Sequence, residues 1–246
     1  MFKSVAVTAF SVAALTLSSV TLADFTNGPN PYDPGFGFDT PTEAGWGWNR
    51  GDAGTIYAEW EHWTGASNPG APDVGVSGTP SATMGWNAGT FAAGSGNLYN
   101  FSGIQIFDID IDGSNGPAAG PVLVALQIED WGNHIGFDNT GTPIPNSILL
   151  NGMSPDQTID GYIDPSYQSS FGEVELYQRL FTWTLDAPAA NYNFDFAGGP
   201  HLSLSQVAVD IGAAAVPLPA AAWLFISSIL GLGALSRRRQ TTQAIA

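Results

Sequence analysis

Glycine and proline are spread so densely through most of this chain that they leave little room for long helices. Residues 24–215 contain 28 glycines and 15 prolines, more than a fifth of the segment, and few windows of twelve residues lack one. Either residue destabilises the interior of a helix. No internal repeat organises them. This distribution favours short strands joined by turns.

Between these helix breakers, apolar residues recur at every second position. Segments 56–60, 107–112, 181–185 and 192–196 alternate apolar side chains with polar or charged ones. Such alternation predicts strands with one face in a core and the other in solvent. Segment 121–128 is almost continuously apolar, so we expect it to be a central strand.

The phase of this alternation changes at two places. Near Gln178 and again near Ser205, the apolar positions shift from even to odd residue numbers. A strand that changes phase needs one extra residue, so a β-bulge is predicted at each place. Many short strands with bulged corners predict an all-β fold, an antiparallel β-sandwich of jelly-roll-like form.

The central part of the chain is strongly acidic and lacks cysteine. Residues 24–215 hold all 22 acidic residues but only two basic ones, Arg50 and Arg179, which gives a formal charge of −20. Nucleic acids and anionic lipid surfaces bind through clustered Lys and Arg, so both are poor partners. We expect the acidity to keep the domain soluble, with binding of divalent cations as the alternative. The absence of cysteine excludes disulfides, cysteine-based metal sites and a cysteine nucleophile.

The N-terminus has the composition of a cleavable signal peptide. Lys3 precedes an apolar run over residues 5–20, and residues 21–23 supply small side chains where a signal peptidase cleaves. We therefore predict a signal-peptide helix over residues 1–23, with cleavage before Asp24.

The C-terminus has the pattern of a membrane span. Residues 218–235 are apolar apart from two serines and two glycines, and roughly 20 such residues cross a hydrocarbon core of about 30 Å. Pro217 and Pro219 are poorly tolerated inside a helix and mark its start. The arginines at 237–239 should stay cytoplasmic, which places the preceding residues outside the inner membrane. The alternative is a buried C-terminal helix of the globular domain.

Together these segments predict an exported protein that is held in the membrane at its C-terminus. Its parts are a signal peptide (1–23), an exported β-sandwich domain (24–211), a linker (212–215), a sorting tail (216–239) with a transmembrane helix over 218–235, and a short cytoplasmic end (240–246).

The C-terminal pattern resembles the PEP-CTERM family of bacterial sorting signals, in its Val-Pro-Leu-Pro-Ala variant. The match covers about 25 residues: Val216, Pro217, Leu218, Pro219 and Ala220, then Trp223-Leu224, Gly231-Leu232-Gly233, and Arg237, Arg238 and Arg239. The family usually carries Glu where this chain has Leu218, which leaves the subtype of the processing enzyme open. The resemblance implies a Gram-negative bacterium and processing by an exosortase, a multi-spanning membrane cysteine transpeptidase. It also implies release or re-anchoring at the cell surface, alongside exopolysaccharide and biofilm matrix.

Asp108, Asp110 and Asp112, followed by Gly113, resemble the opening of a calcium-binding loop. Hard oxygen ligands at alternate positions before a turning glycine suit Ca²⁺. An EF-hand would place Glu at the twelfth position, where this chain has Ala119. The other interpretation is an exposed acidic strand face that ends in an Asp-Gly turn.

Several tryptophans are candidates for stacking on sugars. Trp46 and Trp48 flank Gly47, and Trp131 follows two acidic residues. A pyranose ring can lie against an indole while nearby carboxylates accept hydrogen bonds from its hydroxyls. Aromatic residues also fill the core of a sandwich without disulfides. We expect that role for Trp60, which shares a face with Ile56.

Catalytic signals are few. Glu129, Asp130 and His134 lie close together in the sequence, as do Glu59, Glu61 and His62, but a glycosidase needs two carboxyls facing each other across a cleft. We therefore expect a non-catalytic, exosortase-processed protein of the envelope or extracellular matrix. The alternatives are a carbohydrate-binding module, with or without bound Ca²⁺, and a polysaccharide-active hydrolase.

Overall fold

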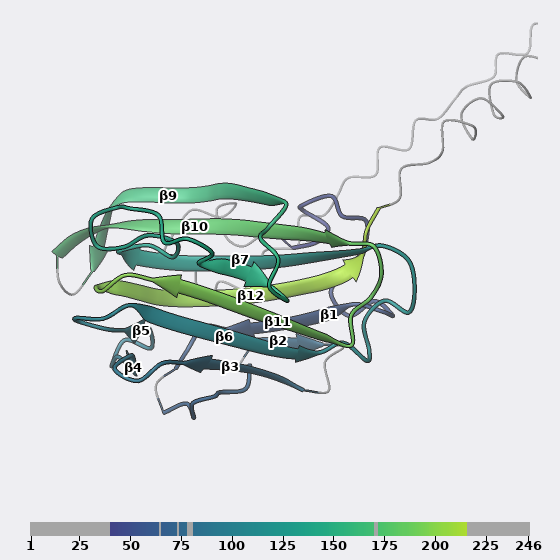
Figure 1. Cartoon of the computed structure of the whole chain (residues 1–246), viewed down its shortest axis with the longest axis horizontal. Helices are drawn as coiled ribbons and strands as arrows, with labels where there is room; N and C mark the ends of the chain where they lie inside the picture. The colour runs from purple at the N-terminus through teal and green to yellow at the C-terminus, as the bar shows by residue number, and fades with distance from the viewer. Residues whose placement is uncertain (1–39, 64, 73, 78–80, 170–171, 216–246) are drawn as a thin grey trace, which may run out of the picture.

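The computed structural model of the chain describes residues 40–63, 65–72, 74–77, 81–169 and 172–215 (Figure 1). The predicted signal peptide (1–23), the sorting tail (216–239) with its span over 218–235, and the end at 240–246 lie outside these residues. Every regular element in the described part is a strand, and no helix there is long and apolar enough to cross a membrane.

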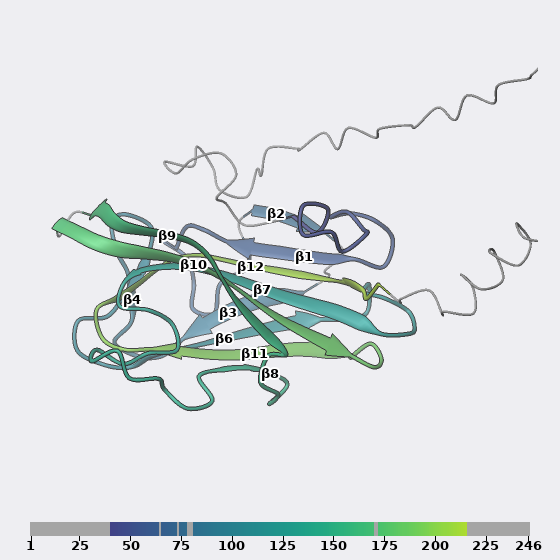
Figure 2. The ribbon, with the colours of Figure 1, turned by 90° about the horizontal axis from the view of Figure 1, so that it is seen from above.

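The strands form two antiparallel sheets, which Figure 2 shows as two layers. The larger sheet has the order β2-β1-β12-β7-β10-β9, with β5 on β12 and β4 on β5, and the smaller has the order β3-β6-β11-β8. The strand bounds are β1 (Ile56–Trp60), β2 (Val74–Ser77), β3 (Ala82–Trp86), β4 (Phe91–Ala92), β5 (Leu98–Tyr99), β6 (Gln105–Asp112), β7 (Val122–Gly132), β8 (Ile148–Leu150), β9 (Gln157–Ser169), β10 (Gly172–Leu185), β11 (Asn191–Gly198) and β12 (Leu202–Ala213). The predicted all-β antiparallel sandwich is confirmed.

Large aromatic side chains fill the space between the sheets. Phe107 and Phe196 are register partners whose rings stack at 5.0 Å, and Trp183 meets Phe194 edge to face at 5.7 Å. The buried indole of Trp60 donates to the Gly70 carbonyl at 3.2 Å, so its polar group is satisfied. These rings provide the core of a chain that has no disulfide, and Trp60 is a core residue as predicted.

Strands from the two halves of the domain pair in nested fashion. β1 pairs with β12, β6 with β11, and β7 with β10, so early strands meet late ones. Most contacts therefore join residues far apart in the sequence. β7 lies between β12 and β10, which confirms that segment 121–128 belongs to a central strand.

Both predicted bulge positions coincide with shifts in strand register. The pairing of β12 with β7 shifts between Leu204 and Gln206, with Ser205 as the extra residue. At Gln178, the pairing of β10 with β9 shifts between Tyr177 and Arg179, with the extra residue on β9, while β10 stays in continuous register with β7. The phase changes there because Leu176 packs against Trp131 in a second cluster, on the sheet face that points away from the main core.

The two sheets differ on their outer faces. The predicted alternation of buried and exposed residues holds along β6 and β11 of the smaller sheet. It is wrong for β1, where all five residues are buried, including Tyr57 and Glu59 on the outer face. The larger sheet thus buries polar side chains on a face that the sequence pattern assigned to solvent.

The domain also ends later than predicted. β12 continues through Ala213, with Gly212 opposite Leu123 and Ala213 opposite Val122. The amide of Ala214 donates to the Pro121 carbonyl at 2.9 Å. The predicted linker at 212–215 is therefore largely part of the sandwich.

Candidate functional site

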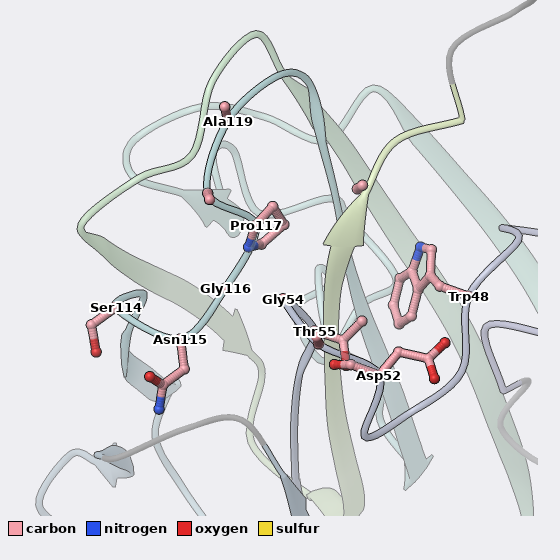
Figure 3. A pocket seen from close by; sticks show the side chains of 12 residues that line it. Trp48, Asp52, Gly54, Thr55, Ser114, Asn115, Gly116, Pro117 and Ala119 are labelled. Carbon is pink, nitrogen blue, oxygen red and sulfur yellow. The ribbon is translucent and has the colours of Figure 1, made fainter.

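A pocket of about 640 Å³ opens at the end of the sandwich where β12 leaves the sheet. Its walls come from Trp48 and residues 52–55, from residues 114–119 between β6 and β7, and from Ala213 (Figure 3). This volume falls in the usual range for small-molecule sites, about 300–1,000 Å³.

The backbone places Trp48 in this pocket because β12 has no side chain beneath it. A Cβ added to Gly212 would lie 2.3 Å from the indole Cε2 of Trp48, so only glycine allows the ring to pack on the strand. Gly47, with φ of 87°, turns the chain between Trp46 and Trp48. The two indoles are half-buried, with ring centroids 5.9 Å apart.

The pocket combines this aromatic surface with a few polar groups. Figure 3 shows the carboxylate of Asp52 beside Trp48, while Ser114 and Asn115 lie on the other side of the β12 end. Asp52 is the one carboxylate among the lining residues, and its Oδ2 accepts from the Asn49 amide at 2.8 Å. Such a pocket can hold a neutral polar ligand against a ring, but it lacks the second carboxyl that glycoside hydrolysis requires.

Trp131 does not join Trp46 and Trp48. It lies near the other end of β7 from Leu123, the residue opposite Gly212, roughly 25 Å along the strand. The ring is 8% exposed and packs against Leu176 and edge to face against Tyr167. The three predicted sugar-stacking residues therefore separate into a half-buried pair and a core residue.

The three aspartates predicted as a calcium site lie on β6, a strand and not a loop. Asp108 and Asp110 are exposed on its outer face, where alternate residues stand about 7 Å apart. Asp112 accepts from the Ser114 amide at 2.8 Å and so caps the turn. Burial, then the charges of Asp110 and Asp195, raise the pKa of Asp108. Among the described residues, no three His, Asp or Glu side chains are grouped to hold a metal.

In the first catalytic candidate, Glu129 and Asp130 lie on opposite faces of the larger sheet. Asp130 points to the core side, where its Oδ1 lies 2.5 Å from His134 Nδ1 and its Oδ2 lies 3.5 Å from Arg179. Glu129 points to the other face and accepts from Gln178 at 2.5 Å and from Ser205 at 2.7 Å. Asp130 Oδ2 also accepts a hydrogen bond from the backbone amide of Ile135, and this bond anchors the start of the connection to β8.

Glu59, from the second catalytic candidate, belongs to a polar network that the sequence did not reveal. On the outer face of the larger sheet, Tyr57 and Gln206 both donate to the fully buried carboxyl of Glu59. Burial raises the pKa of Glu59 to about 8. Arg50 forms a two-bond ion pair with Asp210 at 2.8 and 2.7 Å and lies 3.9 Å over the Tyr57 ring.

Glu61 and His62, the other two residues of the second catalytic candidate, do not lie on β1 with Glu59. Glu61 and His62 follow the end of β1, and His62 packs against Gly96, where an added Cβ would lie 2.5 Å from its Nδ1. The network around Glu59 therefore joins β1 to β12 and does not assemble an acid–base pair with a histidine.

A second unanticipated feature is an aromatic surface cluster at the opposite end of the sandwich. Phe91 and Phe101 are 41% and 57% exposed and stack at 5.6 Å, with Tyr99 beside both. The Tyr99 hydroxyl lies 2.9 Å from His201 Nδ1. The cluster comes from short strands and loops whose spacing in the sequence carries no periodic signal.

Comparisons with protein-family models, with curated proteins and with solved structures find no match to the chain. The fold and the geometry of the described residues therefore carry the functional argument, together with the sequence of the C-terminal tail.

Proposed function

We propose that the chain is an exported, non-catalytic component of the bacterial envelope or extracellular matrix that an exosortase processes at Val216–Pro219. The signal peptide at 1–23 directs export, and the span at 218–235 stops transfer with Arg237–Arg239 in the cytoplasm. Exopolysaccharide is the matrix polymer with which such a protein would associate.

The observation that carries this proposal is where the sandwich ends. β12 stays paired through Ala213, and the sorting motif begins three residues later, at Val216. A complete β domain followed at once by proline, an apolar run and arginines is the arrangement expected of a cargo with an appended sorting signal. The network around Glu59 and the separation of Glu129 from Asp130 support a structural role for these carboxylates.

The nested strand pairing also supports a jelly-roll variant. First-with-last pairing of β1 with β12, β6 with β11 and β7 with β10 is the wrapping expected when one long hairpin folds over itself. The fold departs from a regular jelly roll at β9, which pairs with β10 in the larger sheet. Jelly rolls occur in lectin and capsid domains, which bind or assemble without catalysis.

Processing can be tested in a Gram-negative host with and without an exosortase that reads this motif. Without the enzyme, the chain should lack residues 1–23 and stay in the inner membrane with Ala246 intact. With the enzyme, a shorter product ending near Val216 should reach the cell surface or medium, as measured by mass spectrometry of each fraction.

Substitution at the motif separates processing from insertion. Pro217→Ala with Pro219→Ala should keep the chain in the inner membrane but abolish the shorter product. A chain that stays in the cytosol with both Met1 and Ala246 present would contradict the proposal.

The pocket favours carbohydrate binding as a second candidate function. Trp48 and the carboxylate of Asp52 both line the pocket, which suits a sugar ring and its hydroxyls, and the half-buried ring of Trp46 lies 5.9 Å from that of Trp48. Titrating matrix oligosaccharides should shift tryptophan fluorescence, and Trp48→Ala should abolish the shift while Phe101→Ala at the other end leaves it. No shift in the unsubstituted protein would exclude this candidate for the sugars tested.

A further inference from the structure

We propose that, before processing, one end of the sandwich rests on the lipid headgroup layer and is held there by a short tether. This exit face consists of residues 46–55, 113–120, 186–190 and 213–215. The inference depends on the proposed function, because it takes residues 218–235 as the membrane span.

The length of the tether is the main argument. The last anchored residue is Ala214, whose amide donates to the Pro121 carbonyl at 2.9 Å. Four residue steps lead from there to Leu218, and even fully extended they cover at most about 14 Å. The headgroup layer occupies about 5–8 Å of this on each side of the bilayer. The end of β12 must therefore lie within about 10 Å of the membrane surface.

The loops around the exit take up this remaining gap. In both views, the connection between β6 and β7 reaches past the end of β12 (Figures 1 and 2). It belongs to the same end because Ala213 pairs with Val122, the first residue of β7. The turn at 186–190 lies there too, since Leu185 also pairs with Val122.

The chemistry of the exit face suits an interface better than the rest of the domain does. Its four ranges, 26 residues together, contain Asp52 and Asp186 as acidic residues and Arg50 as a basic one, a formal charge of −1, where a proportionate share of the −20 of residues 24–215 would be about −3. Residues 113–120 carry no charge. The half-buried indoles of Trp46 and Trp48 lie on this face, and amphipathic indoles favour the headgroup level of a bilayer.

The aromatic rings at the opposite end of the sandwich lie too far from the tether to reach the membrane. β7 has 11 residues, so its two ends are about 35 Å apart. The exposed Phe91 and Phe101 lie at that far end, where the tether keeps them away from the bilayer. The proposal thus predicts contact at the exit face despite the more exposed aromatic rings elsewhere.

A matched pair of single-cysteine variants tests the proposal, because the chain has no cysteine of its own. Ser114 lies on the exit face and Ser102 at the far end, and both are exposed. In each case the backbone amide donates to the side chain two residues earlier, Asp112 at 2.8 Å and Asn100 at 3.0 Å. Ser114→Cys and Ser102→Cys therefore change only the exposed hydroxyl.

The full chain is isolated from the inner membrane of a host without exosortase and labelled with a fluorophore. It is then reconstituted in phosphatidylcholine–phosphatidylglycerol vesicles whose headgroups carry a nitroxide quencher. The label at position 114 should lose most of its fluorescence, and the label at 102 should lose none beyond the quencher-free control. Inserting a flexible glycine–serine linker between Ala215 and Val216 should restore the fluorescence at 114.

Each other outcome is decisive. If the chain floats with the vesicles but neither label is quenched, or both are quenched equally, the exit face does not rest on lipid while the tail still anchors the chain. Quenching at 114 that persists with the inserted linker overturns the tether argument. If the label at 114 changes its fluorescence only when exosortase is added to the vesicles, the exit face contacts that protein and the proposed lipid contact is overturned. A chain that does not float contradicts the proposed function itself.

Discussion

Glu59 makes the stability of the sandwich depend on pH. Its carboxyl is completely buried on the outer face of the larger sheet, and it accepts hydrogen bonds from Tyr57 of β1 and Gln206 of β12. Burial raises its pKa from 4.5 to about 8, although those hydrogen bonds and Arg50 act in the other direction. The folded domain therefore binds a proton at Glu59 over a pH range in which the unfolded chain has released it.

The sign and size of the effect follow from this shift. A raised pKa contributes stability that is complete below the unfolded value of 4.5 and is lost as the pH rises through about 8. At about 1.36 kcal/mol per pKa unit, the free energy of unfolding falls by about 5 kcal/mol across that range. A domain of this kind has about 5–15 kcal/mol in total, so the loss is large.

Glu59→Gln should remove this dependence. The amide has nearly the same shape, can donate to the Tyr57 oxygen and accept from Gln206, and carries no charge at any pH. Urea unfolding of residues 24–215 between about pH 5 and pH 8 should show a much flatter profile for the variant and higher stability than the unsubstituted domain near pH 8. Glu173→Gln, at an exposed carboxylate, serves as the control and should leave the profile unchanged. Parallel profiles for Glu59→Gln and the unsubstituted domain would refute the reasoning.

Three further predictions concern other contacts of the domain. Gly212→Ala should displace the Trp48 ring and lower the unfolding free energy by about 1–3 kcal/mol, whereas Gly94→Ala, which meets nothing within 4 Å, should change it little; equal effects would contradict the packing. Asp130→Asn removes the carboxylate facing buried Arg179, so denaturant titration should show a loss of about 3–5 kcal/mol, and a loss below 1 kcal/mol would be inconsistent with that pairing. Because the aspartates of β6 lie on an extended strand, a calcium chelator should leave Tm unchanged, and a clear drop would indicate a calcium site.

The sequence predicted those features that follow from alternation along a single strand. β6 and β11 alternate buried and exposed residues as expected, because their outer face is open to solvent. Ser205 was predicted as a bulge because Leu204 and Val207 both face the same core across it. In these cases one core determines the pattern.

The sequence misled where a second layer of packing covers the outer face. Leu176 faces away from the main core and packs against Trp131, so the phase change in β10 reflects two packing faces, while the register shift at Gln178 lies in its pairing with β9. Similarly, Glu59 has the spacing of a solvent-facing residue, but its burial depends on what lies over the sheet. Periodicity along one strand cannot report on that second layer.

Long-range polar contacts were also beyond sequence reasoning. Arg50 and Asp210 are 160 residues apart, and only the nested pairing that brings β1 beside β12 places them together. The pocket depends on Gly212, which carries no signal in the sequence except as one glycine among many. Its neighbour Trp48 was identified as a candidate, but its packing partner was not.

The central claim is that the domain is exported while the C-terminus remains in the cytoplasm, and a reporter fused after Ala246 tests it most directly. In a host without exosortase, green fluorescent protein at this position should fluoresce in the inner-membrane fraction, and alkaline phosphatase at the same position should be inactive. An active phosphatase fused after Ala246, or a fluorescent fusion that stays in the cytosol, would contradict the topology on which the proposed function depends.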